Sequence, residues 1–106
     1  MAIFQIPVQV GVRDQEFQVD LEGRLYTLRL AWNIRAEAWF LSLSDSDGVA
    51  ILSGKKVVVD WDLLRTLADE RRPPGRLAAM DLEGLGTAPG LDDLGERVVL
   101  TYLESE

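Results

Sequence analysis

The segment from Arg24 to Gly48, RLYTLRLAWNIRAEAWFLSLSDSDG, constrains the fold of this 106-residue chain more than any other part of the sequence. Apolar and polar residues alternate along most of it, and turn-forming residues interrupt the alternation. A period of two residues is typical of β-strands that bury one face and expose the other. The segment therefore predicts consecutive antiparallel strands whose register can be read from the sequence.

A tight turn at Glu22-Gly23 predicts the first hairpin of this series. With a two-residue loop there, the apolar residues of the two strands share one face, in the pairs Val19–Tyr26 and Phe17–Leu28. On the other face Glu16 lies opposite Arg29, an oppositely charged pair. A slip of one residue would destroy both matches, so the register is strongly specified.

The connection at 33–36 predicts a second hairpin in the same series. Its register places large apolar residues opposite one another, in the pairs Trp32–Trp39, Leu30–Leu41 and Leu28–Leu43. The next turn, at Asp45–Gly48, has a loop of either two or four residues, and both versions place Leu52 on the apolar face. The result is a four-stranded meander with one dry face.

Further strands are expected on either side of the meander. Residues 3–10 alternate, and Pro7 indicates an edge strand because proline cannot donate to a sheet ladder. The β-branched run 57–59 predicts a short strand, continuous with Lys55 and Lys56 as edge charges. Residues 77–82 predict another strand. The stretch 97–103 is apolar on both faces, which predicts a strand paired on both sides or covered by a helix.

One short helix is expected between the strand groups. Asp60 or Asp62 would cap its start, and the basic pair Arg71-Arg72 would end it before two prolines. Its apolar stripe would consist of Leu63, Leu64, Leu67 and Ala68. Residues 83–94 are rich in glycine and predict a surface loop. Together these elements predict an all-β, or β-dominated, single domain spanning residues 1–106: a small antiparallel sandwich or a partly closed β-barrel with one short helix.

Composition excludes several classes of function. The chain has neither cysteine nor histidine, so it lacks thiol nucleophiles, disulfides, imidazole bases and the usual zinc ligands. Its net charge of −7 opposes binding to nucleic acids and anionic membranes. No stretch has the ~18 consecutive apolar residues of a membrane-spanning helix, and the first ten residues do not resemble a signal peptide.

Few residues suggest chemistry. Asp45-x-Asp47-Gly48 lacks the remaining ligands of a calcium loop and is better explained as a turn. Two carboxylates could supply the acid and base of sugar hydrolysis, but solubility and capping explain the available ones better: Asp60, Asp62, Asp92 and Asp93. Gly84-x-Gly86 lacks the rest of a phosphate-binding motif. We therefore expect no catalytic, cofactor-binding or metal-binding residues.

The aromatic residues of the meander raise the question of a single-strand nucleic-acid surface, but the register assigns most of them to the core. Phe40 is the apolar exception on the polar face, where Ala31 and Leu25 accompany it. Either Phe40 covers a helix or second sheet, or Phe40, Ala31 and Leu25 mark a protein interface.

The pattern from Phe17 to Gly48, F-x-V-x-L-x-G-x-x-Y-x-L-x-L-x-W-N-x-R-A-x-x-W-F-L-x-L-x-D-x-D-G, resembles the small baseplate plug proteins of contractile-tailed bacteriophages. The resemblance continues through Asp62-Leu63-Leu64, Pro74-Gly75-Arg76-Leu77 and the ending from Asp93 to Leu103. It covers nearly the whole chain, and the loop between Asp81 and Asp92 departs from it.

The resemblance implies a structural component of the virion, located in the tail baseplate and assembled in the host cytoplasm. Its partners would be the phage tail hub, tube and spike proteins, with three or six copies in the baseplate, and neither nucleic-acid specificity nor a membrane would be involved. It implies no catalytic residues. The main alternative from the strand pattern is an OB-like module that binds an oligonucleotide or oligosaccharide.

Overall fold

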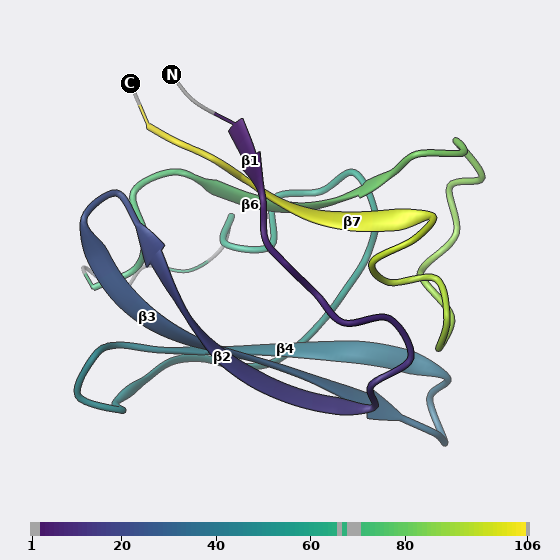
Figure 1. Ribbon diagram of the computed structural model, residues 1–106, viewed down its shortest axis with the longest axis horizontal. Coiled ribbons are helices and arrows are strands. Elements are labelled where there is room, and N and C mark those ends of the chain that lie inside the picture. Colours follow the sequence, from purple (N-terminus) through teal and green to yellow (C-terminus); the bar gives the residue numbers. More distant parts are fainter. Residues whose placement is uncertain (1–2, 66, 68–70, 106) are drawn as a thin grey trace.

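A computed structural model of the chain describes residues 3–65, 67 and 71–105, and in them it shows two antiparallel sheets packed face to face (Figure 1). The seven strands are β1 (Ile3–Gln5), β2 (Asp14–Leu21), β3 (Arg24–Asn33), β4 (Ala38–Ser44), β5 (Ala50–Lys56), β6 (Arg76–Asp81) and β7 (Val98–Leu103). One sheet has the order β2-β3-β4-β5, and the other has the order β1-β7-β6. The first and the last strand, β1 and β7, are neighbours in the smaller sheet.

The first two hairpins of the four-stranded sheet have the register that the sequence predicts, whereas the third does not: Ser44 lies opposite Ala50 across a five-residue loop, and the β4–β5 ladder is irregular. Every predicted pair of the first two hairpins is present, from Val19 opposite Tyr26 to Trp32 opposite Trp39. Glu22 and Gly23 both have positive φ, 57° and 85°, as a two-residue hairpin loop that matches strand twist requires. Local alternation and turn chemistry therefore determine these two hairpins.

One detail of the outer face differs from the prediction. Arg29 lies opposite Glu16 in the ladder, but its guanidinium binds the carboxylate of Asp14 with two hydrogen bonds, at 3.0 and 2.7 Å. Through this bidentate contact the arginine side chain extends diagonally across the strand pair. Its hydrogen bond lowers the pKa of Asp14.

The smaller sheet explains why residues 97–103 are apolar on both faces. β7 is its central strand, paired with β1 on one side and β6 on the other, as the sequence predicts. β1 is an edge strand, also as predicted, but it ends at Gln5. The predicted strand at 77–82 is confirmed as β6.

The core lies between the two sheets and draws on both. Tyr26, Leu28 and Leu30 of β3 are buried, as are Leu77 of β6 and Leu100 of β7. Other fully buried members of the same cluster are Leu21, Trp39, Leu41, Leu43, Val57, Leu63, Leu64, Ala79, Leu94, Val98 and Tyr102. Because neither sheet covers its own apolar face, each depends on the other for stability.

The predicted helix is wrong. Among the residues described there is no helix. Residues 63–65 form a turn in which Arg65 N donates to Asp62 O at 3.1 Å, a three-residue step. Leu63 N bonds to Leu77 O of β6 at 2.7 Å, which holds the start of this segment against the smaller sheet. Leu63 and Leu64 are buried between the sheets, so their apolar pattern reflects core filling. Ala68 of the predicted stripe lies outside the described residues.

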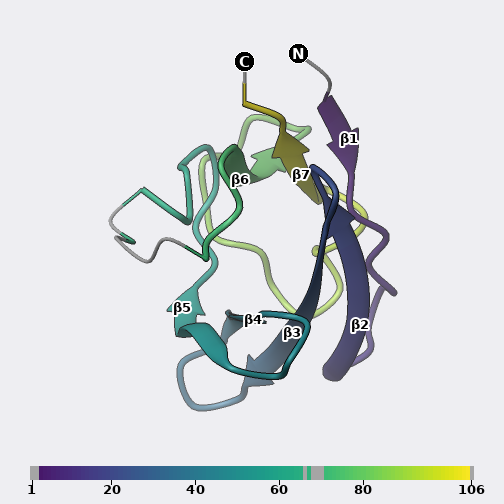
Figure 2. The same cartoon turned by 90° about the vertical axis from the view of Figure 1, so that its left-hand side faces the viewer.

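The predicted strand at 57–59 is also wrong. β5 ends at Lys56, and Val57 turns inward, where its N bonds to Trp39 O at 2.8 Å. Val59 forms only an isolated bridge to Ala79. Figure 2 shows this segment leaving β5 for the smaller sheet, and the two sheets do not close into a barrel. The sandwich prediction is therefore confirmed, whereas the barrel and OB-like alternatives do not describe this fold.

Candidate functional site

The three residues predicted to mark an interface lie on the outer face of the four-stranded sheet, but they do not form one patch. Ala31 and Phe40 are cross-strand neighbours. Leu25 lies six residues away along β3, a distance of roughly 20 Å at the rise of a strand. The second sheet packs against the opposite face, and in the described residues Phe40 does not belong to the core cluster. Phe40 is half-buried and Leu25 is exposed.

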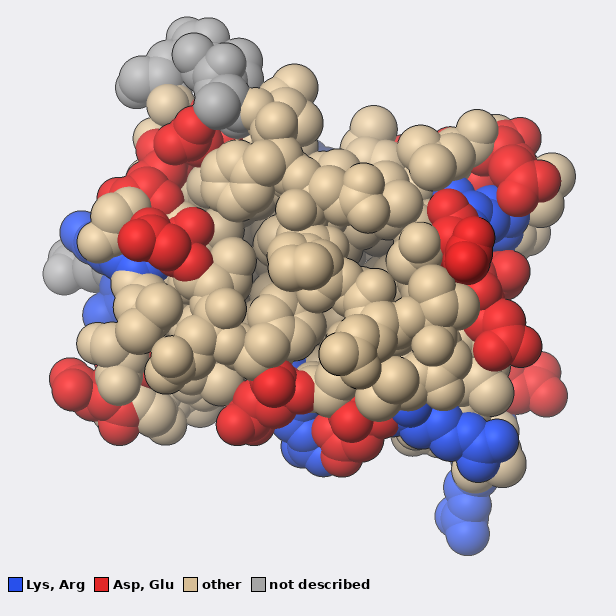
Figure 3. All heavy atoms as spheres, viewed as in Figure 1, with Lys and Arg blue, Asp and Glu red and all other residues tan. Residues whose placement is uncertain are grey.

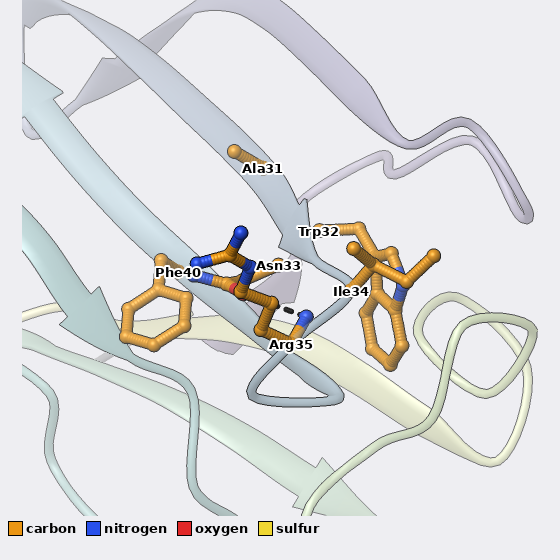
Figure 4. A pocket seen from close by; sticks show the side chains of 6 residues that line it. All are labelled: Ala31, Trp32, Asn33, Ile34, Arg35 and Phe40. Carbon is orange, nitrogen blue, oxygen red and sulfur yellow. Dashed lines mark hydrogen bonds between the residues drawn. The ribbon is translucent and has the colours of Figure 1, made fainter.

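A shallow hollow lies beside Phe40, at the end of β3 and the turn that follows it (Figure 4). Its lining consists of Ala31, Trp32, Asn33, Ile34, Arg35 and Phe40. Asn33 shapes the turn, because its Oδ1 accepts hydrogen bonds from Arg35 N and Ala36 N, both at 3.0 Å. The Phe40 ring lies apart from Trp32 and Ile34, with Arg35 between them. The hollow therefore combines apolar side chains with one cation.

Ile34 was missed by the sequence reasoning, which treated 33–36 only as a connection. Its side chain is 73% exposed, more than the other large apolar residues of the described chain. An isoleucine inside a tight turn has no strand face on which to be buried. That mismatch between residue type and local structure was the available signal.

A second exposed apolar surface lies outside the smaller sheet. Trp61 and Met80 are 45% and 41% exposed, and both line a depression that includes Leu103. The guanidinium of Arg65 lies 4.6 Å from the centre of the Trp61 ring, a cation–π contact. The sequence reasoning did not identify this surface, because Trp61 stands outside every alternating segment.

Two of the four candidate carboxylates have structural roles. Asp62 Oδ1 accepts hydrogen bonds from the amides of Leu64 at 3.0 Å and Leu77 at 3.3 Å, which ties the segment after β5 to β6. Asp93 Oδ2 accepts one from the amide of Gly90 at 2.7 Å. Carboxylates committed to backbone amides are typical of capped turns.

The other acids also occupy turns. Asp60 and Asp92 are exposed in turns, and Asp45 Oδ1 accepts hydrogen bonds from the amides of Asp47 and Val49, at 3.0 and 2.9 Å. The turn interpretation of 45–48 is therefore confirmed. Across residues 3–65, 67 and 71–105, no group of three histidine, cysteine or acidic residues is placed to hold a metal ion.

The glycine-rich loop is organised by a buried ion pair. Arg97 donates to the Asp81 carboxylate at 2.9 Å, and both side chains are at most 8% exposed. Asp81 also accepts hydrogen bonds from the amides of Glu83, Gly84 and Gly86, at 3.0, 3.1 and 2.8 Å. The amides of Gly84-x-Gly86 thus bind the chain's own carboxylate instead of a phosphate.

The ionisation of Asp81 follows from the same contacts. Burial alone would raise its pKa, but the amides of Gly86 and Glu83 and the charge of Arg97 outweigh burial, so the pKa of Asp81 lies below its ordinary value. A carboxylate held in its ionised form by fixed donors is a poor proton donor. Its role is to order the loop.

The arrangement of exposed apolar surfaces on a two-sheet sandwich, with the four candidate carboxylates in or beside turns, suits a binding protein. A comparison with protein families identifies the group: the family model for the cyanophage baseplate Pam3 plug gp18 matches residues 3–105. The chain belongs to this baseplate plug family. The resemblance found in the sequence is therefore confirmed, and it extends over almost the whole chain. No curated protein matches the chain in a sequence comparison.

Membership of a baseplate plug family supports a structural role in the phage baseplate, in association with other baseplate proteins. It also implies a location in the tail of the virion. Within the described part of the chain, no helix is long and apolar enough to cross a membrane.

Proposed function

We propose that the protein plugs or joins the end of the tail tube at the central hub and spike, that it acts through protein–protein contacts, and that it catalyses no reaction. The match of residues 3–105 to a baseplate plug family carries this proposal. The use of two candidate carboxylates, Asp62 and Asp93, as acceptors of backbone amides in turns supports the absence of catalysis. The rigid two-sheet core supports a role in holding neighbouring proteins in place.

The contacts with the partners would involve the apolar surfaces described above. The hollow beside Phe40 and the surface around Trp61 lie on the outer faces of opposite sheets. An aromatic residue beside an arginine is a frequent centre of protein interfaces, since both types contribute much of the binding energy. Two such surfaces on opposite sides would let one subunit contact two neighbours.

The baseplate is expected to hold three or six copies, because a protein at the axis of a tail must share its rotational symmetry. Assembly would take place in the host cytoplasm, where an acidic chain without cysteines needs no oxidising environment. Neither nucleic acid nor membrane would take part.

Mass measurement tests the proposal directly. The purified chain should be measured alone and after mixing with the hub, tube and spike proteins of the same phage. We expect it to join at least one of them in a complex of defined stoichiometry, with copies in multiples of three. A chain that joins none of these proteins would contradict the proposed function.

The hollow beside Phe40 gives a second test. The substitution Phe40→Ala should weaken binding to the tail partner by about 10- to 30-fold, the loss typical of an interface anchor, and should change thermal stability little. Leu82→Ala is a matched control, because Leu82 is 65% exposed and lies in the loop after β6. A large loss of stability in Phe40→Ala, with partner binding intact, would assign Phe40 to the core instead.

A further inference from the structure

The outer edge of β2 is open. β2 pairs with β3 on one side, and no other segment of the described chain pairs with its eight residues. The ladder parity is fixed by the bond from Trp32 N to Arg13 O at 2.7 Å. In an antiparallel pair the bonded residues alternate, so the backbone groups that point to the open edge belong to Asp14, Glu16, Gln18 and Asp20.

This edge carries acids on one side and apolar residues on the other. Asp14, Glu16 and Asp20 are exposed on the outer face of the sheet. On the inner face Phe17 and Val19 pack against the core but remain half-buried, since β2 is the last strand and lacks a neighbour to cover them. Natural edge strands are usually protected by charged side chains, especially lysine, by proline or by a bulge. The acids of β2 would repel another acidic strand but not a basic one, and neither a proline nor a bulge interrupts β2.

A groove runs along the first half of this edge. It is formed by β2 and the segment before it, and its lining consists of Pro7, Val8, Gln9, Val12, Asp14, Gln15, Glu16, Phe17 and Gln18. Gln15 fixes the far wall: its amide exchanges two hydrogen bonds with the backbone of Gln9, both at 3.0 Å. The groove is therefore held in shape before any partner arrives.

The surroundings of the groove have the pattern of an interface. Figures 1 and 2 place β1, the segment that follows it and β2 on one side of the molecule. The space-filling view of that side shows a centre of uncharged residues, with acidic and basic side chains at the rim (Figure 3). A centre without charged side chains and a charged rim match the depletion of charge at the core of protein interfaces.

We propose that the open edge of β2 binds an extended strand from a basic partner protein, which adds a fifth strand to the four-stranded sheet. Alternate residues of the added strand would be lysine or arginine and would face Glu16 and Asp20, since Arg29 already binds the carboxylate of Asp14. The intervening residues would be apolar and would cover Phe17 and Val19. Main-chain hydrogen bonds would supply affinity, and the alternating side chains would supply specificity. This proposal rests on the proposed function, for which it defines one contact.

The charges argue against a second copy of the chain as the occupant. Pairing β2 with β2 of another copy would set acids against acids across the new ladder, which is destabilising. β5 is the other edge strand of this sheet, but its pairing with β4 has irregular register around Leu43. Two copies would also carry −7 each. A basic strand from another protein would be attracted by the acids of β2 and would not depend on β5.

A synthetic probe tests the site without a known partner. The probe is an acetylated and amidated peptide of four Lys-Val repeats, and the matched control contains four Glu-Val repeats. We expect the lysine peptide to bind with an affinity that falls as salt rises, and the glutamate peptide to bind far more weakly. On binding, hydrogen exchange should slow at the amides of Glu16, Gln18 and Asp20. Absence of binding, or protection elsewhere in the chain, would overturn the proposal.

Two variants locate the interaction on β2. The double substitution Glu16→Lys and Asp20→Lys should weaken binding of the lysine peptide by about tenfold or more, because two attractive cross-strand pairs become repulsive. Gln18→Pro removes an N–H from the open edge, a change that edge strands tolerate better than central strands. Circular dichroism should establish that this variant folds. If it does not fold, the double charge variant alone locates the binding site. The double substitution Asp47→Lys and Glu83→Lys, at exposed positions outside β2, changes the net charge by the same amount and is the control for net charge. Equal binding by all these proteins would overturn the proposal.

The same variants separate this site from the proposed function. If they join the hub, tube or spike proteins as well as the original chain does, strand addition at β2 is not how those partners bind, and this proposal fails while the proposed function stands. If the original chain joins no tail protein yet binds the lysine peptide at β2, the edge site stands and the proposed function fails. Self-association that the β2 variants abolish would identify a second copy as the occupant and would also overturn the proposal.

Discussion

At the scale of single residues, one hydrogen-bond network joins the two sheets. The Tyr102 hydroxyl, on β7, donates to the carboxylate of Glu22 and accepts from the amide of Gly75 at 2.8 Å. The other carboxylate oxygen of Glu22 accepts from Ser105 Oγ at 2.6 Å and Ser105 N at 3.2 Å. The turn of the first hairpin is thus fastened to the last strand of the opposite sheet.

Removing the hydroxyl should destabilise the protein. Tyr102→Phe leaves the amide of Gly75 without its acceptor in a buried position, so the free energy of unfolding should fall by about 1–3 kcal/mol. Urea unfolding at neutral pH measures the loss. A substitution of Gly75 cannot replace this test, because a Cβ at Gly75 would lie 2.1 Å from the carbonyl oxygen of Leu103 and would distort the backbone. Stability equal to that of the original chain would show that the network contributes nothing.

The network also predicts how stability depends on pH. Hydrogen bonds from Ser105 and Tyr102 hold the pKa of Glu22 below its ordinary value of 4.5. The stabilisation is therefore complete above that value and is lost as the pH falls through the lower folded-state pKa. Glu22→Gln should lose this part of the acid dependence, whereas Glu83→Gln, in an exposed loop position, should keep it. Parallel acid-unfolding curves for all three proteins would contradict the prediction.

This network was beyond sequence reasoning for a physical reason. Glu22 and Tyr102 are 80 residues apart, and no periodicity links them. The hairpin registers, by contrast, depend on neighbours within about twenty residues, whose side-chain parity is visible in the sequence. Phe40 was found by that parity, because it breaks the alternation within a strand. Trp61 was missed because it lies outside the strands, where side chains do not alternate between two faces and an apolar residue does not stand out.

At the scale of elements, Arg97 should control the loop between β6 and β7. Arg97→Met would remove the buried partner of Asp81, and the melting temperature should fall by roughly 10 °C, since an uncompensated buried charge is strongly destabilising. Hydrogen exchange at the amides of Gly84 and Gly86 should accelerate more than exchange in β3. Arg24→Met is the control, because Arg24 is exposed. If the loop amides stay protected from hydrogen exchange in Arg97→Met, Asp81 orders the loop without the ion pair to Arg97.

The elements also show where local patterns mislead. The stripe that predicted a helix consists partly of Leu63 and Leu64, which are buried between the sheets in turns. In a short segment, the apolar spacing of a helix cannot be distinguished in the sequence from that of an irregular segment that fills the core. The competing force is tertiary: Leu63 N bonds to β6, and that bond exists only once the second sheet has formed. Sequence could predict the strands of the meander but not this connection.

At the scale of the whole molecule, the two sheets share one core, so the chain should unfold as a single unit. Leu41 belongs to the larger sheet and Leu100 to the smaller, and both are at most 1% exposed. Leu41→Ala and Leu100→Ala should each lower the free energy of unfolding by about 2–5 kcal/mol, because each leaves a cavity in the common core. Leu85→Ala removes the same atoms from a side chain that is 62% exposed and should change stability little.

Tryptophan fluorescence and far-ultraviolet circular dichroism should report one coincident transition for every variant. Two separate transitions, with each buried substitution shifting only the one that belongs to its own sheet, would contradict the single-domain prediction for residues 1–106.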